Sequence, residues 1–160
     1  MLACQATKNN MTLENKTTYR PRGNARTRLS KLTARAFSLW SRCVKKRDGH
    51  VCQLCGAREG ELKANGKPVI LNAHHLVGRQ CHPLRFDLQN GLTLCQHCHK
   101  FSPDGPHRGM LVFHDWLKRE RPGVCDYLLS HRDADAGMVE SETQMQIIVG
   151  ELEEALDAMP

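Results

Sequence analysis

The sequence predicts a small α+β fold, in which two short strands and a short helix lie between longer amphipathic helices. Three observations support this prediction. Apolar residues recur every three or four positions over residues 29–46 and 142–159, which is the spacing of one helix face. A β-branched run at 68–75 is typical of a strand, and a second short apolar run covers 91–94. Two Cys-x-x-Cys pairs lie before and after these strands, and a short helix is expected at the second pair.

The chain divides into four segments. Residues 1–28 are polar and arginine-rich, so we expect a disordered basic arm. Residues 29–122 are expected to form one domain that begins with an amphipathic helix ended by Gly49. Residues 123–141 are expected to be a linker. Residues 142–160 predict an acidic amphipathic helix that packs back on the domain, dimerises or shields the basic face, and the sequence leaves these three options open.

Charge is distributed unevenly along the chain. The net charge is +6, but residues 1–50 hold 12 Lys/Arg against 2 Asp/Glu, whereas residues 101–160 hold 5 against 12. A basic front half is the expected footprint of a polyanion, because Lys and Arg on phosphates release condensed counterions. A solvated basic tail without a partner is the alternative, and charge alone does not decide between them.

The two cysteine pairs have the spacing of metal ligands. Cys52 with Cys55, and Cys95 with Cys98, each form a tight knuckle that directs two thiolates at one ion, and two knuckles complete a tetrahedral structural zinc site. No secretory signal and no long apolar run is visible, so we expect reduced thiols, a cytoplasmic location and no membrane partner. The four other cysteines, Cys4, Cys43, Cys81 and Cys125, are expected to be buried or incidental.

A closed zinc site needs no further ligands, so nearby polar residues are free for other chemistry. These are the pair His74 and His75, then Asn90, and His99 directly after the second knuckle. Each has a simpler explanation: strand-end histidines, a turn asparagine, or a spare zinc ligand. Their combined occurrence between and directly after the two cysteine pairs predicts a catalytic site.

The order of these motifs resembles the HNH endonuclease family. The matching stretches are Ala73-His74-His75-Leu76, Asn90-Gly91-Leu92-Thr93-Leu94-Cys95, Cys98-His99, and Arg47 to Gly56 ahead of them. His75-Leu76-Val77-Gly78-Arg79 with Leu84-Arg85-Phe86-Asp87 is similar to a phage-type subgroup that includes the NinG/Rap recombination nucleases. The resemblance covers residues 35–120 and implies a ββα-metal, or His-Me finger, unit.

The resemblance implies a role for each matching residue. His75 would be the general base that activates water, and Asn90 would fix the loop and orient His75 through its amide. His74 and His99 would hold a divalent cation. Many relatives have Asp where this chain has His74, and imidazole favours transition metals, so Mn²⁺ or Ni²⁺ would serve as well as Mg²⁺. DNA contacts are expected from five basic residues: Arg42, Lys45, Lys46, Arg79 and Arg85.

These expectations predict a metal-dependent, phage-encoded HNH endonuclease that hydrolyses phosphodiester bonds in duplex or branched DNA, in the host cytoplasm. Two alternatives remain open. One is a zinc-ribbon module that binds nucleic acid without catalysis. The other is an accessory subunit of a phage recombination or packaging complex that docks on a phage protein, or on a second copy, through residues 142–160.

Overall fold

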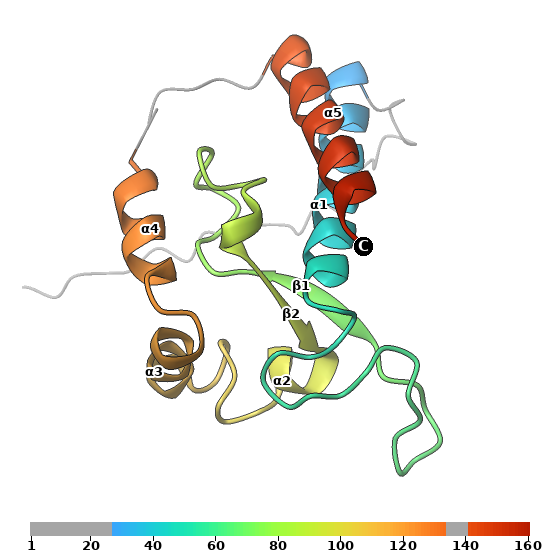
Figure 1. The fold of residues 1–160 in the computed structure, drawn as a ribbon, viewed down its shortest axis with the longest axis vertical. Helices are drawn as coiled ribbons and strands as arrows, with labels where there is room; N and C mark the ends of the chain where they lie inside the picture. The colour runs from blue at the N-terminus through green and yellow to red at the C-terminus, as the bar shows by residue number, and fades with distance from the viewer. Residues whose placement is uncertain (1–26, 134–140) are drawn as a thin grey trace, which may run out of the picture.

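The computed structural model describes residues 27–133 and 141–160, which form an α+β fold around a two-stranded sheet (Figure 1). The predicted fold class is confirmed. The predicted arm falls mostly on residues 1–26, which lie outside the described residues, as does the 134–140 part of the predicted linker. The elements in chain order are α1 (Arg28–Arg47), β1 (Leu71–His75), the 3₁₀ turn η1 (Leu88–Asn90), β2 (Gly91–Cys95), α2 (Gln96–Lys100), α3 (Met110–Glu120), α4 (Val124–His131) and α5 (Glu142–Ala158).

The sheet sets the relative positions of the predicted site residues. β1 and β2 are antiparallel, with Leu71 opposite Cys95 and His75 opposite Gly91. One end of the sheet therefore carries the second cysteine knuckle, and the other end carries His75 beside Asn90. The predicted strands are confirmed, although the first begins at Leu71 and residues 68–70 precede it.

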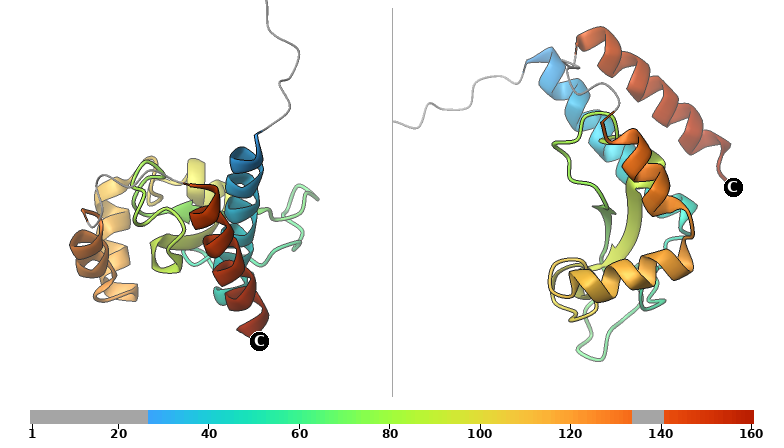
Figure 2. Two further views of the ribbon diagram at one scale, coloured as in Figure 1. Left: turned by 90° about the horizontal axis from the view of Figure 1, so that it is seen from above. Right: turned by 90° about the vertical axis from the view of Figure 1, so that its left-hand side faces the viewer.

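α5 packs along α1 (Figures 1 and 2). The apolar faces of both helices form one core with these buried members: Ala36, Leu39, Trp40, Cys43, Val44, Met145, Val149, Leu152 and Leu156. Arg28 pairs with Glu142 and Arg35 with Glu153, while Lys46 donates to the carbonyl of Leu156. Residues 142–158 pack back on the domain, which is one of the three predicted roles of residues 142–160. The apolar face of α5 is thus covered within the chain.

The linker predicted at 123–141 is wrong over residues 124–131, which form α4. Val124 and Leu128, one helical turn apart, are buried against Leu84 and Leu117. A segment of eight residues is too short for apolar periodicity to identify a helix, so the tertiary contact is what reveals this one. None of the helices in the described residues has the length and apolar character needed to cross a membrane.

Asp48 connects the end of α1 with β2 and with the end of α3. Its side chain is only 2% exposed and forms ion pairs with Arg47 at 2.9 Å and Arg121 at 2.8 Å. Its second carboxylate oxygen accepts from the backbone N–H of Thr93 in β2 at 2.8 Å. The chain then turns at Gly49, whose φ of 64° lies in the left-handed region, as predicted for the end of the first helix.

Candidate functional site

The four cysteines predicted to bind zinc lie together. Their sulfur atoms, from Cys52, Cys55, Cys95 and Cys98, lie within 4.8 Å of one another. Zinc–sulfur bonds of about 2.3 Å at tetrahedral angles place neighbouring sulfurs about 3.8 Å apart, and the Cys55 and Cys95 sulfurs are 3.8 Å apart. We refer to these residues as the cysteine cluster, and it could hold a structural ion such as zinc.

Local hydrogen bonds shape the cysteine cluster. The Gln53 backbone N–H donates to the Thr93 carbonyl at 2.9 Å, which attaches the first knuckle to β2. The Cys95 sulfur accepts from the Cys98 N–H at 3.4 Å and so caps α2. Burial, together with the neighbouring thiols, raises the pKa of Cys98 far above its ordinary range. Neighbouring thiolates repel one another, so four of them are stable together only beside a cation, which is the charge that a metal ion supplies.

A second cluster of possible ligands contains His74 and His99, as expected, and also His107 (the histidine cluster). The ligand nitrogens of these three residues lie within 4.8 Å of one another. His99 Nε2 lies 3.1 Å from His74 Nδ1 and 3.2 Å from His107 Nε2. One N–H can donate along only one of these two directions, so convergence of three imidazole nitrogens fits metal ligands better than a closed hydrogen-bond network.

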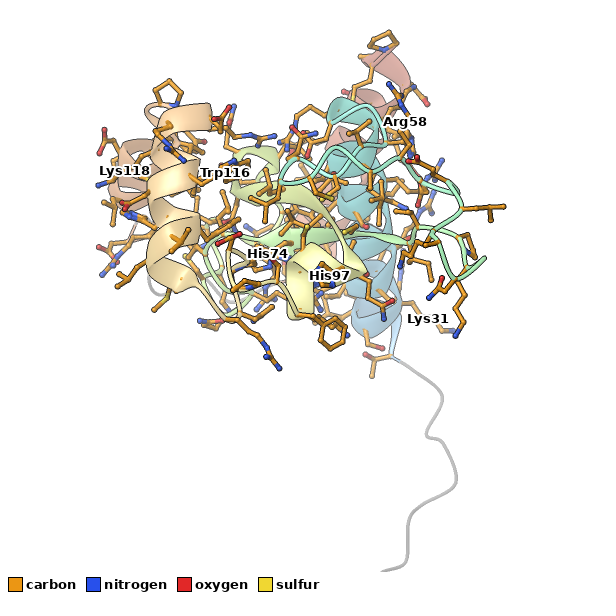
Figure 3. All side chains as sticks on the ribbon, turned by 90° about the horizontal axis from the view of Figure 1, so that it is seen from below. Lys31, Arg58, His74, His97, Trp116 and Lys118 are labelled. Carbon is orange, nitrogen blue, oxygen red and sulfur yellow. The ribbon has the colours of Figure 1, made fainter. Side chains whose placement is uncertain are left out.

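The histidine cluster is assembled from a strand, a helix and a loop. Figure 3 shows His74 between α2 and α3, and its ring lies 4.9 Å from that of His99 and 6.1 Å from that of Phe113. Burial and the neighbouring imidazoles of His99, His107 and His75 lower the pKa of His74 to about 3. His74 is therefore neutral at pH 7 and has a lone pair to offer. Imidazole donors suit a transition metal.

His107 was not among the predicted ligands. It lies eight residues after His99, in the loop 101–109, and no fixed spacing in the sequence points to it. The loop folds back tightly, because the Gly109 N–H donates to the Gly105 carbonyl at 2.8 Å. A Cβ atom at Gly109 would collide with the Pro103 carbonyl. Gly109 and the Asp104-Gly105-Pro106 run are sequence signals that could have indicated such a turn.

His75 lies on the other face of β1, because successive strand residues point to opposite sides. Its ring stacks on Trp40 of α1 with a centroid distance of 3.7 Å. Its Nε2 lies 2.9 Å from the Arg85 carbonyl. A carbonyl only accepts, so Nε2 carries the proton and Nδ1 has the free lone pair. Burial and the charges of Arg79 and Arg85 lower the pKa of His75, which favours the neutral ring.

Asn90 is fully buried and fixes the loop after β1. Its side-chain oxygen accepts from the Val77 N–H at 2.6 Å, and its amide nitrogen donates to the carbonyls of Val77 and Leu84, both at 2.9 Å. The expectation that it fixes the loop is confirmed. Among the described residues, the side-chain bonds of Asn90 go to the loop, and the His75 ring is held by the Arg85 carbonyl in that loop.

The five expected DNA-contacting residues divide into two groups. Arg79 lies with its guanidinium 4.9 Å from the Phe37 ring centroid, and Arg85 donates to the Arg79 carbonyl at 2.6 Å, so both are near His75. On α1, Arg42 is exposed, whereas Lys45 pairs with Glu59 at 3.1 Å and Lys46 donates to the C-terminal turn of α5 at 3.2 Å. Lys45 and Lys46 thus have intramolecular partners that the sequence did not indicate.

Comparison of the chain with protein-family models, with curated proteins and with solved structures finds no match. The geometry of the two clusters and of His75 is therefore what indicates a function for this chain.

Proposed function

We propose that the protein is a metal-dependent endonuclease of the HNH type that hydrolyses phosphodiester bonds in DNA. One observation carries the proposal: three imidazoles, from β1, α2 and the loop 101–109, converge, and the residue after His74 in β1, His75, is a neutral histidine with a free Nδ1. Metal-assisted hydrolysis requires a bound cation and a base with an unprotonated nitrogen, and these residues could supply both.

Each part of the site has a role in this proposal. His74, His99 and His107 would hold the divalent cation, Mn²⁺, Ni²⁺ or Mg²⁺, which supplies charge to stabilise the phosphate in the transition state. His75 takes a proton from the attacking water at Nδ1, while the Arg85 carbonyl keeps the proton on Nε2. Arg79 and Arg85 bind a neighbouring phosphate of the strand.

The cysteine cluster has a separate, structural role. It lies at the opposite end of β2 from Gly91, the residue opposite His75, and it joins the first knuckle to the sheet and to α2. A zinc ion held by Cys95 at the end of β2 and Cys98 in α2 would fix the angle between these elements, and therefore the position of His99 relative to His74. The proposed nuclease thus uses one ion to hold the fold and a second ion for chemistry.

Cleavage of supercoiled plasmid tests the proposal. Purified, zinc-loaded protein is incubated with EDTA, Mg²⁺, Mn²⁺ or Ni²⁺, beside His75→Ala and the control His114→Ala, which changes an exposed histidine of α3. We expect metal-dependent nicking that falls about 10²-fold or more in His75→Ala and is unchanged in His114→Ala. Equal cleavage by wild type and His75→Ala would reject His75 as the base. If neither plasmid nor branched DNA is cleaved with any of the metals, the non-catalytic binding module is the better interpretation.

A further inference from the structure

Trp40 and Phe37 of α1 form an aromatic shelf under the His75 ring. Trp40 is only 1% exposed, and its ring is nearly parallel to that of His75, with an interplanar angle of 16° at 3.7 Å. Phe37, one helical turn earlier, meets the His75 ring edge-on at 6.1 Å. Both residues belong to the apolar face of this helix, and both contact the proposed base.

The same short segment of chain holds both stacked rings. Trp40 Nε1 donates to the Asp87 carbonyl at 2.9 Å, and His75 Nε2 donates to the Arg85 carbonyl at 2.9 Å. These two carbonyls are two residues apart, so a shift of the segment would move both rings together. The stack is therefore held by residues 85–87, which bond to both rings, and by α1, which carries Trp40.

Stacking removes a freedom that the hydrogen bond leaves. An imidazole turns about its Cβ–Cγ bond, and this axis passes between Cε1 and Nε2. A hydrogen bond at Nε2 therefore resists small rotations weakly, but it distinguishes the ring from its flipped form. The direction of Nδ1 depends on that rotation. A flat aromatic surface against one face of the His75 ring allows two orientations, which differ by a 180° rotation about the Cβ–Cγ bond. The hydrogen bond from Nε2 to the Arg85 carbonyl excludes one of the two. The free energy of an aromatic stack is large enough to favour one ring orientation over the others.

Phe37 extends the shelf to the phosphate-binding side. The Arg79 guanidinium lies over its ring at 4.9 Å, and the Phe86 ring packs against it at 4.9 Å. A cation over an aromatic face is held by the ring quadrupole without losing its outward N–H donors. The shelf therefore fixes the positions of the proposed base and of a proposed phosphate ligand relative to each other.

We propose that Trp40 and Phe37 are positioning residues: Trp40 sets the direction of His75 Nδ1, and Phe37 holds Arg79 beside it. The inference rests on the proposed nuclease function. A base-stacking role for Trp40 does not fit, because a side chain that is 1% exposed offers no surface to a nucleobase. Trp40 acts through His75, so its loss affects turnover, whereas the loss of Phe37 affects DNA binding through Arg79.

The test compares Trp40→Phe, Trp40→Leu and Phe37→Leu with wild type in plasmid cleavage, measuring kcat and KM separately. Trp40→Phe retains a flat ring and should keep kcat within about threefold. Trp40→Leu should lower kcat by about 10²-fold with KM unchanged, as misplacement of a reacting group does. Phe37→Leu should raise KM by about two- to fivefold, the loss expected for one cation–π contact.

A matched control separates positioning from packing. Leu39→Ala removes a neighbouring buried side chain of the same helix, which packs in the core shared with α5. Leu39→Ala should lower the unfolding temperature. Its kcat, measured about 20 °C below its own unfolding temperature, should stay at the wild-type value. If Trp40→Leu does not fold, Trp40→Phe and Phe37→Leu still test the inference, and the ring-current shift of the His75 imidazole protons measures the stack directly by NMR.

The outcomes are distinct. His75-dependent cleavage by wild type with an unchanged kcat in Trp40→Leu would overturn the inference and leave the nuclease proposal in place. Absence of an upfield ring-current shift at His75 would overturn it as well. No His75-dependent cleavage by wild type would reject the proposed function, and the inference with it. Rescue by Phe but not by Leu supports it.

Discussion

Asn90 acts on His75 through a single peptide link. The Asn90 amide donates to the Leu84 carbonyl at 2.9 Å, and the carbonyl of the next residue, Arg85, accepts from the His75 ring at 2.9 Å. The asparagine and the histidine also lie at the same end of the sheet, because His75 is opposite Gly91. Asn90 therefore determines where the proposed base can point without contacting it.

Replacing Asn90 should cost stability and activity together. Asn90→Ala leaves the Val77 N–H and two carbonyls without their partners, and each unsatisfied buried group costs about 1–3 kcal/mol. We expect the free energy of unfolding in urea to fall by about 3 kcal/mol and kcat to fall as His75 loses its fixed acceptor.

Two comparisons sharpen this test. Asn90→Asp keeps the acceptor for Val77 but cannot donate to the carbonyls of Val77 and Leu84, so it should not rescue. Gln89→Ala changes the exposed neighbour and should behave as wild type. If Asn90→Ala and Gln89→Ala were equally mild, Asn90 would be an ordinary turn residue.

His107 should contribute to binding of the second metal ion and not to binding of zinc. His107→Ala removes one of three convergent nitrogens, so the affinity for Ni²⁺ or Mn²⁺, measured by titration calorimetry on zinc-loaded protein, should fall at least about tenfold. The zinc content should be unchanged, because the cysteine cluster is a separate group of ligands. His114→Ala is the matched control. Unchanged affinity in His107→Ala would show that the ion is held without it.

The parts of the fold that follow a local pattern could be predicted from the sequence. The helices α1 and α5 have three- or four-residue apolar spacing, and the two cysteine pairs have the spacing of metal ligands. α4 was missed because its eight residues carry only two buried positions, Val124 and Leu128, and their partners lie elsewhere in the chain.

The candidate site divides in the same way. His74, His75, Asn90 and His99 are marked by order along the chain. His107 reaches the histidine cluster only because the loop 101–109 folds back, which is a tertiary property. Lys45 and Lys46 were assigned by charge alone, and charge does not reveal that Glu59 and the Leu156 carbonyl lie within reach of them. Contacts between distant residues are what the sequence could not supply.

Loss of the cysteine cluster should unfold the domain. Binding of a structural zinc supplies about 10–16 kcal/mol at pH 7 in small domains, so Cys95→Ser, or chelator added to wild type, should remove the cooperative unfolding transition seen by circular dichroism. Cys81→Ser is the control, since Cys81 lies outside the cluster and is partly exposed. A stable Cys95→Ser protein without bound zinc would contradict a structural role.

Asp48 should make stability depend on pH in the acid range. Although burial opposes its ionisation, hydrogen bonds and charge from Arg47, the Thr93 N–H and the charge of Arg121 hold the pKa of Asp48 below its ordinary value of 3.8. A carboxyl whose pKa is lower in the folded state binds protons more weakly there than in the unfolded chain. Its stabilising contribution is therefore complete above the unfolded pKa and is lost as pH falls through the folded pKa.

Asp48→Asn tests this with the side-chain shape retained. At pH 7 the variant should be less stable than wild type by about 3 kcal/mol, the cost of removing one partner of a buried ion pair. The difference between the two proteins, measured by urea unfolding with zinc in excess, should stay constant from pH 7 to about pH 5 and narrow below it. Following the difference cancels the acid loss of zinc, because both proteins have the same cysteine cluster. A difference that widened as pH fell would mean that the pKa of Asp48 is raised by burial, and that its two arginines do not compensate.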